Sequence, residues 1–204
     1  MDSYGQTYAE EAGIRLADRP RPLYQLLVLT SLLGKRISAE IAVAAARELF
    51  AAGLDNPQSM VDTSWQDRVD ALGRGHYRRY DESTARLLGA AAERCLNRWQ
   101  GDLRRLRREA NGDVRRLRQL LVEFPGIGPT GADIFVREVQ AVWPEYQPAI
   151  DAKVAEGARA LRLDPSSIPR LAPARDLPRL TSALVRAGRA RQLPEELRSQ
   201  LPRR

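Results

Sequence analysis

The sequence LVEFPGIGPTGADIFVREV, residues 121–139, decides the fold. Two helix-like patterns stand on either side of a short turn, residues 125–129, which contains two prolines and two glycines. In the second pattern, apolar residues at i, i+3, i+4 and i+7 share one helical face: Ala132, Phe135, Val136 and Val139. That face can pack on the apolar side of the first helix, with Ile127 inserted between the two. Residues 114–142 are therefore predicted to form two helices joined by a tight hairpin.

The turn itself offers a cluster of backbone donors. Glycine adopts φ values that are closed to other residues and leaves nearby N–H groups unshielded, which we expect at Gly126 and Gly128. Pro129 presets the first turn of the second helix and lacks a donor that would not be used there. Outward N–H groups at the positive end of a helix suit a phosphate group. The alternative is a tight helical corner that binds no ligand.

Helical periodicity extends over most of the chain, and strand signals are nearly absent. Residues 23–33 are apolar on almost all sides of a helix, which predicts a buried central helix that directly follows Pro20 and Pro22 in the sequence. Further helices are expected at 38–52, at 63–73 behind a capping box of Thr63 and Gln66, at 81–100, after Pro148, and at 177–188 and 194–201. We therefore predict an all-α fold, in which Cys95 is a small core residue.

The charge of the chain favours a polyanionic partner. Its 204 residues include 33 basic and 26 acidic side chains, which give a net charge of +7. Such an excess attracts nucleic acid, because basic side chains neutralise phosphates and release counterions. Only Lys35 and Lys153 are lysines, so 31 of the 33 basic residues are arginine (33 − 2). A GC-rich genome also enriches arginine, and this second explanation stays open.

The rarity of cysteine and histidine excludes several kinds of site. A single cysteine, Cys95, allows neither an internal disulfide nor a cysteine-ligated cluster. With a single histidine, His76, a Cys/His zinc site is also excluded, and no nucleophile-elbow pattern accompanies it. The first residues lack the features of a secretory signal, and no apolar segment approaches the length of a membrane span. We expect a cytoplasmic, nucleoid-associated protein without a membrane partner.

Two motifs together resemble a known family. Residues 124–128 read FPGIG and precede a helix, and residues 148–151, PAID, open the next one. This order resembles the helix-hairpin-helix DNA glycosylases of the endonuclease III type. Asp151 follows Gly128 by 23 residues (151 − 128), and the extra length falls in the loop before Pro148. The resemblance covers residues 23–188.

The resemblance implies an all-helical fold of two lobes. Residues 23–154 would form a central lobe that contains the helix-hairpin-helix. Residues 1–22 and 155–204 would form a terminal lobe. The cleft between the lobes would hold a nucleotide flipped out of double-stranded DNA, which costs least energy at damaged or mismatched sites.

The resemblance also implies a reaction. Asp151 would lie beside the sugar of the flipped nucleotide, where an ionised carboxylate stabilises the positive charge that develops during N-glycosidic cleavage. Thr130 stands where the bifunctional members carry a lysine, so the expected activity is monofunctional removal of an altered base, without a lyase step. The iron–sulfur cysteines of many members are missing, and no other cofactor is expected. A monovalent cation at the hairpin is compatible with the resemblance.

The implied DNA contacts lie in three places. Gly126, Ile127, Gly128 and Thr130 would hold a backbone phosphate without reading the sequence. Leu33 would fill the gap left by the flipped base, with Lys35 beside it. The basic run at 104–118 supplies further candidates, or else a solvated helix face: Arg104, Arg105, Arg115, Arg116 and Arg118. Tyr77 and Tyr80 are candidates for stacking in the cleft, or ordinary aromatic residues at the lobe boundary.

Two other functions stay open. A non-catalytic DNA-binding or accessory protein could keep this fold without the chemistry; Thr130 favours that alternative and Asp151 opposes it. A helical protein-interaction module is the other, if the charge reflects only genome composition. For the glycosylase and for the non-catalytic DNA-binding protein, the expected partner is double-stranded DNA, which a monomer would bind.

Overall fold

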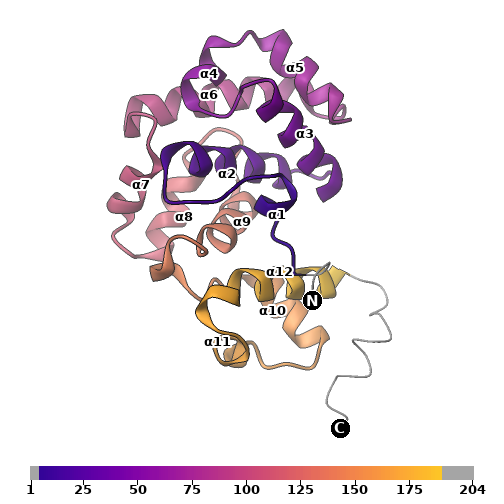
Figure 1. Ribbon diagram of the computed structural model, residues 1–204, viewed down its shortest axis with the longest axis vertical. Coiled ribbons are helices and arrows are strands. Elements are labelled where there is room, and N and C mark those ends of the chain that lie inside the picture. The colour runs from indigo at the N-terminus through magenta and orange to yellow at the C-terminus, as the bar shows by residue number, and fades with distance from the viewer. Residues whose placement is uncertain (1–4, 190–204) are drawn as a thin grey trace.

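The computed structural model describes residues 5–189, and all regular elements in this range are helical (Figure 1). The prediction of an all-α fold is therefore confirmed for this part of the chain, whereas the predicted helix at 194–201 lies outside the described residues. The helices are α1 (Tyr8–Glu11), α2 (Pro20–Leu33), α3 (Ala39–Ala51), α4 (Pro57–Asp62), α5 (Trp65–Arg74), α6 (Asp81–Trp99), α7 (Leu103–Ala110), α8 (Val114–Val122), α9 (Pro129–Val139), α10 (Ala152–Ala160), α11 (Ile168–Leu171) and α12 (Leu177–Arg189), with short 3₁₀ helices η1 (Pro144–Tyr146), η2 (Pro165–Ser167) and η3 (Ala174–Asp176).

Local capping residues set most of the helix boundaries. Pro20 lies in the first turn of α2, where its missing donor costs nothing, and the Ser38 side chain accepts a hydrogen bond from the first turn of α3. The predicted capping box of Thr63 and Gln66 is wrong. Ser64 caps α5 instead, with its hydroxyl oxygen 3.1 Å from the Asp67 nitrogen. The Thr63 hydroxyl is not available, because it donates to the Ser59 carbonyl oxygen at the end of α4.

Helix α2 passes through the centre of the larger hydrophobic core. It packs against α3, α6, α7 and α9, and Figure 1 shows it between the upper helices and α9. Leu23, Leu26, Leu29 and Leu32 have no exposed surface, although they lie on different sides of the helix. This position explains why the sequence of α2 is apolar almost all round.

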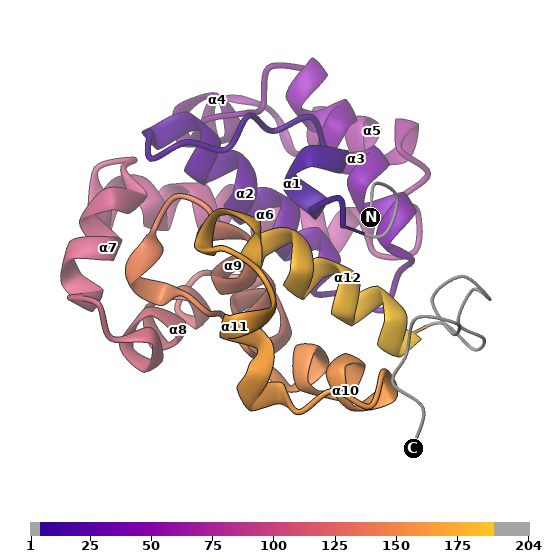
Figure 2. The ribbon, with the colours of Figure 1, turned by 60° about the horizontal axis from the view of Figure 1, so that its bottom comes forward.

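A second, smaller hydrophobic core lies within α10, α11 and α12. Its buried residues are Val154, Ala158, Ile168, Leu177, Leu184 and Val185. Figures 1 and 2 both show these helices grouped at one end of the molecule. Helices α10 and α12 cross at close range at Gly157, where an added Cβ would lie only 1.8 Å from the Leu184 carbonyl oxygen. Any larger residue at this position would force the two helices apart.

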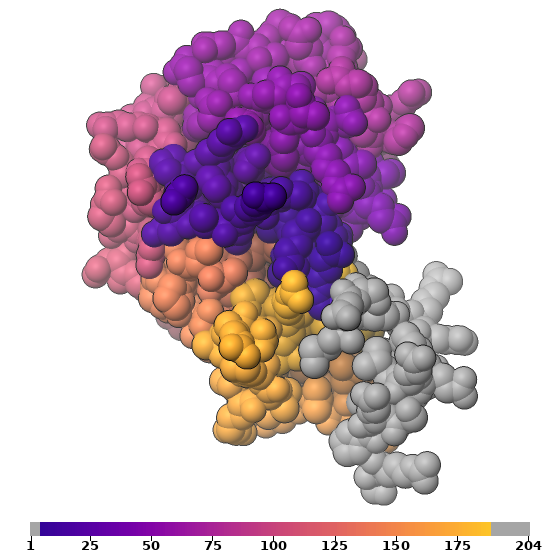
Figure 3. Space-filling view, viewed as in Figure 1, coloured from indigo at the N-terminus to yellow at the C-terminus, as the bar shows by residue number. Residues whose placement is uncertain are grey.

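Helix α1 contacts both cores. Tyr8 and Ala9 are buried in the larger core, while Glu10 and Glu11 form ion pairs with Arg179 and Arg186 of α12. In Figure 3 the N-terminal segment lies on the surface between the upper helices and the C-terminal ones. The predicted grouping of residues 1–22 with 155–204 into one lobe stays a prediction, since α1 belongs equally to the larger core.

None of the helices in the described part of the chain combines the length and the apolar character that a bilayer-spanning segment needs.

The prediction that Cys95 is a core residue is confirmed, and it has a chemical consequence. Burial, with a smaller contribution from Asp102, raises the pKa of the Cys95 thiol to about 12. Because only the thiolate is nucleophilic, we expect native protein at about pH 8 to resist a chromogenic thiol reagent. Protein unfolded in guanidinium chloride should react with one equivalent. Rapid labelling of the native protein would show that α6 opens readily.

Candidate nucleic-acid interface

Helices α8 and α9 are joined by a turn, residues 123–128. Asp113 caps α8, and its carboxylate oxygen accepts hydrogen bonds from the backbone nitrogens of Arg115 and Arg116 at 2.8 and 3.3 Å. The apolar faces of the two helices pack together, as predicted. Ile127 is buried and lines a small gap with residues of α2 and α6, so its side chain anchors the turn and is not available to a ligand.

The two glycines of the turn have different roles. Gly126 has a φ of +89°, and an added Cβ would lie 3.1 Å from Ser31 Oγ and 3.2 Å from Leu87 Cβ. Gly128 has ordinary extended angles, φ −96° and ψ −177°, so the prediction that its backbone requires glycine is wrong. An added Cβ at Gly128 would have no neighbour within 4 Å. The bare backbone there is open to the outside.

Several backbone donors of the turn are unused. The N–H of Ile127 is an exception, since it donates to the Phe124 carbonyl oxygen at 3.0 Å. The N–H groups of Gly126 and Gly128 donate to no acceptor within residues 5–189. Gly128 and Thr130 are exposed, and they lie at the N-terminal, positive end of α9. This group of donors can receive an anion without any rearrangement of the turn.

Three backbone carbonyl groups of the turn are also without hydrogen bonds, and the predicted monovalent cation there stays a prediction. The carbonyl groups of Pro125, Gly126 and Ile127 accept no hydrogen bond from the residues that the structure describes. Neutral oxygen ligands of this kind suit a hard cation. By contrast, no three His, Cys, Asp or Glu side chains gather into a metal site in the described ranges.

The loop after α2 lies beside the start of α9. An added Cβ at Gly34 would lie 3.5 Å from the Cα of Gly131, and both glycines approach the Thr30 carbonyl oxygen. Lys35 and the exposed Arg36 directly follow Gly34 at this close approach, and neither has an ion-pair partner within the described residues. The tertiary structure therefore brings the chain segment that carries the predicted contact Lys35, together with Arg36, to the helix that begins with the predicted contact Thr130. Sequence analysis missed Arg36, although it stands directly after Lys35.

Leu33 is half-buried at the end of α2 and packs against the larger core. Only part of its side chain is therefore free to enter a base stack. Of the two candidate stacking residues, Tyr77 is fully buried, and Tyr80 is half-buried under the guanidinium of Arg79, 5.2 Å from the ring centroid. Neither ring presents an open face for stacking.

Most of the candidate arginines are already paired. Arg104 pairs with Asp102 at 2.8 Å, Arg116 with Glu109 at 2.9 Å and Arg118 with Asp133 at 2.7 Å. Arg105 and Arg115 are exposed and have no ion pair in the described part of the chain. Arg115 lies in the first turn of α8, which is roughly 10 Å along the helix axis from the turn at the other end. The structure therefore does not bring Arg115 to the unused donors.

Asp151 is the N-cap of α10, and both of its carboxylate oxygens are occupied. One accepts hydrogen bonds from the backbone nitrogens of Lys153 and Val154 at 2.8 and 2.9 Å. The other forms an ion pair with Arg137 of α9. The side chains of Asp151 and Arg137 are only 5% and 3% exposed. In this arrangement the carboxylate joins two helices and faces neither solvent nor a ligand.

The neighbours of Arg137 extend this buried polar contact. The buried Glu138 side chain accepts hydrogen bonds from the backbone nitrogens of Tyr8 and Ala9 at 3.2 and 2.9 Å, and burial raises the pKa of its carboxyl group. The Gln140 side chain accepts a hydrogen bond from the backbone nitrogen of Ala149 and donates to Thr181 Oγ1. The C-terminal half of α9 thus contacts α1, α10 and α12. The signal in the sequence was the pair of adjacent charged residues, Arg137 and Glu138, among the apolar residues Phe135, Val136 and Val139.

Comparison with protein-family models, with curated proteins and with solved structures gives no match. The functional argument therefore rests on the residues themselves.

The two glycines of the turn should respond differently to alanine. Because of its positive φ and close neighbours, Gly126→Ala should lower the free energy of unfolding by about 1–2 kcal/mol in urea titrations followed by circular dichroism. Gly128→Ala should change it by less than about 0.5 kcal/mol. Gly73→Ala, on α5 with no neighbour within 4 Å, is the matched control and should be neutral or stabilising. Equal losses of unfolding free energy in Gly126→Ala and Gly128→Ala would contradict the described geometry of the turn.

Proposed function

We propose that this protein binds double-stranded DNA, with α8, the turn and α9 acting as a helix-hairpin-helix. One observation supports the proposal: the N–H groups of Gly126 and Gly128 have no acceptor within residues 5–189, and the exposed Gly128 is the N-cap at the positive end of α9. A DNA phosphate would accept hydrogen bonds from these donors. Lys35 and Arg36, which directly follow Gly34, would add charge without selecting a sequence.

The monofunctional DNA glycosylase is the enzymatic form of this proposal. Its support is the order of motifs, a turn followed by an aspartate at the start of the next helix. A carboxylate needs access to the sugar in order to act on it. Asp151 would therefore have to separate from Arg137 when DNA binds, and the energy for that step would come from DNA contacts.

The non-catalytic DNA-binding protein is the second candidate, and the burial of Asp151 favours it. Both carboxylate oxygens are already engaged, and Thr130 supplies no amine for a lyase step. In this candidate the same motifs position the hairpin and the smaller core, and no base is released.

Gly128→Ala tests the phosphate contact without disturbing the fold. The added methyl group would occupy the open side of the turn, where the phosphate must approach. We expect the affinity for duplex DNA, measured by fluorescence anisotropy, to fall on the order of tenfold. Gly73→Ala should bind like the unchanged protein, and affinity should fall steeply with added salt. Unchanged duplex affinity in Gly128→Ala would exclude the hairpin as the DNA contact.

The role of Asp151 requires a variant that keeps the fold. Asp151→Asn alone leaves Arg137 buried without a counter-charge, which costs about 3–5 kcal/mol, so its loss of activity would be ambiguous. The double variant Arg137→Met/Asp151→Asn removes both charges and keeps an N-cap oxygen, and it should be destabilised less than either single variant.

Base release from a panel of lesion-bearing duplexes then separates the two candidates. If the protein is a glycosylase, it releases a base and the double variant does not, although both bind the duplex equally. If it is a non-catalytic binding protein, neither releases a base. Release by the double variant at the unchanged rate would exclude Asp151 as the catalytic carboxylate.

A further inference from the structure

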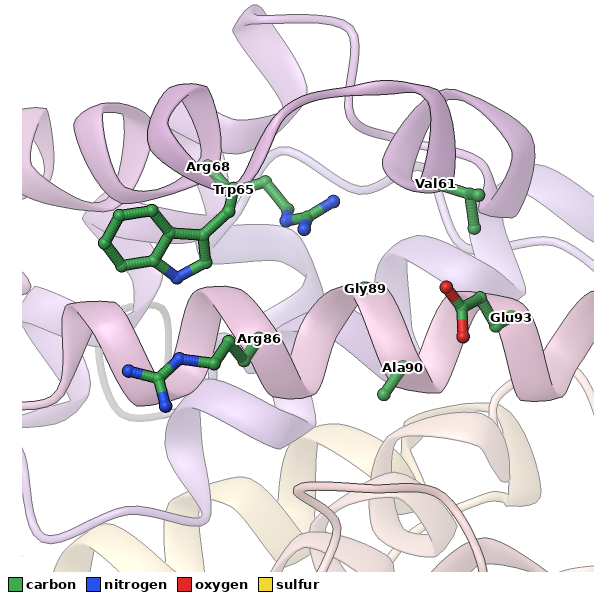
Figure 4. A pocket seen from close by; sticks show the side chains of 7 residues that line it. All are labelled: Val61, Trp65, Arg68, Arg86, Gly89, Ala90 and Glu93. Atoms are coloured by element: carbon green, nitrogen blue, oxygen red, sulfur yellow. The ribbon is translucent and has the colours of Figure 1, made fainter.

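A groove between the α4–α5 segment and α6 lies outside the hairpin. It has a volume of about 460 Å³, and Figure 4 shows the side chains around it. An aromatic ring, two guanidinium groups and one carboxylate line it, together with small apolar residues: Val61, Trp65, Arg68, Arg86, Gly89, Ala90 and Glu93. A mixture of aromatic and cationic groups in one groove suits a ligand with a flat ring and an anionic group.

Arg68 is held in a defined orientation. Its Nη1 donates to the carbonyl oxygens of Met60 and Thr63 at 2.7 and 2.8 Å, which ties the guanidinium to the end of α4. The other donors, Nη2 and Nε, find no acceptor within residues 5–189. Burial lowers the pKa of Arg68, but the group stays charged near neutral pH because arginine is such a strong base. The guanidinium therefore presents Nη2 as an unused donor from a fixed position, whereas the unpaired Nε is buried.

Gly89 makes room for this guanidinium on α6. An added Cβ at Gly89 would lie 3.0 Å from Nη2, 3.1 Å from Cζ and 3.3 Å from Nη1 of Arg68. The planar group thus lies close against the helix surface. Glycine within a helix costs roughly 1 kcal/mol relative to alanine. Glycine at position 89 therefore lowers the intrinsic stability of α6 and leaves space for the Arg68 guanidinium.

Trp65 supplies the aromatic surface. Its indole nitrogen donates to the Glu82 carbonyl oxygen at 3.2 Å, which orients the ring at the edge of the groove. The residue is 37% exposed, whereas Trp99 and Trp143 are buried. Such a ring can stack on a nucleobase, and every base offers a π-face for this contact.

The distribution of charged side chains along the groove would set the orientation of a bound ligand. Arg86 lies near Trp65, and its one ion pair within residues 5–189 is a loose one with Glu82 at 3.7 Å, between two exposed side chains. Glu93, two helical turns further along α6, forms no ion pair with the described residues. A phosphate would be attracted to Arg68 and Arg86 and repelled by Glu93, whose charge also acts on Arg68.

The groove continues toward the hairpin. Ala90 and Glu93 also line a second hollow of about 540 Å³, which reaches Pro125 of the turn. Leu87 of the same helix faces Gly126, where an added Cβ would meet it at 3.2 Å. The surface of α6 therefore connects the two hollows, and a strand that followed it would have to pass the Glu93 carboxylate, which repels phosphate.

We propose that the α4–α5–α6 groove binds an unpaired nucleotide of single-stranded DNA, with the base stacked on Trp65 and the phosphate held by Arg68 and Arg86. The choice of nucleic acid over another aromatic anion rests on the proposed function. The site itself is separate from the hairpin donors, so the two can fail independently.

Tryptophan fluorescence tests the stacking contact directly, since Trp65 is the exposed tryptophan. At low salt, a short oligothymidylate should quench the emission saturably, and added salt should reverse the effect. Trp65→Leu should remove the quenching and weaken oligonucleotide binding, followed by anisotropy, on the order of tenfold. Trp65→Phe, which keeps a ring, should retain most of the affinity. Equal affinity for the oligonucleotide in Trp65→Leu would overturn the proposal.

Matched variants identify the phosphate contact and separate this site from the hairpin. Arg86→Ala should weaken oligothymidylate binding severalfold, whereas Arg159→Ala, which removes an exposed and unpaired arginine on α10, should not. Gly128→Ala should keep the fluorescence response to the single strand even though duplex affinity falls. Benzoate competing as well as thymidine 5′-monophosphate, or equal effects of Arg86→Ala and Arg159→Ala, would overturn the nucleotide assignment.

Discussion

The ion pair between Arg137 and Asp151 is the contact on which the arrangement of this protein depends. It joins the last turns of α9 to the first turn of α10, and it is almost fully buried. A buried charge is costly unless its partner is present and the remaining hydrogen-bonding groups are satisfied. Here Arg137 neutralises the carboxylate, and two backbone N–H groups complete its hydrogen bonding. The chain can therefore place its smaller core at only one position relative to α9.

Helix α9 consequently has two ends with opposite properties. Its N-terminal end is exposed and has backbone N–H donors without an acceptor in the described part of the chain. Its C-terminal end is buried, and the polar side chains of Arg137, Glu138 and Gln140 there all form hydrogen bonds. The turn is held in place by the buried Ile127 side chain and by the close packing at Gly126. The contacts of the C-terminal end of α9 with α1, α10 and α12 hold the helix that follows the turn. Because one helix connects the two regions, a phosphate bound at the hairpin lies at a defined distance from Asp151. The same geometry serves either a scaffold or a catalytic carboxylate, and only access to that carboxylate distinguishes them.

Anion binding depends on which cations are free, more than on the net charge of +7. Arg104, Arg116 and Arg118 are held by neighbouring carboxylates, and a phosphate would have to displace those partners. The hairpin uses backbone donors, which carry no competing counter-charge. In the proposed groove on α6, Nη2 of Arg68 has no partner among the described residues, and α4 and Gly89 set the orientation of its guanidinium. Under the two proposals, both surfaces would be organised before a ligand arrives, which would lower the entropy lost on binding.

The sequence by itself determined the features that depend on contacts within about four residues. The Asp113 cap, the proline start of α9, the all-round apolar α2 and the buried Ile127 could be predicted from periodicity and capping rules. Only the tertiary structure decided which groups meet across the chain. Arg137 meets Asp151, and Gly34 approaches Gly131. Gly126 rather than Gly128 requires glycine, because its φ is positive and an added Cβ would crowd Ser31 and Leu87. Helix capping and amphipathic faces are local properties, whereas the partner of a buried charge depends on how the helices pack.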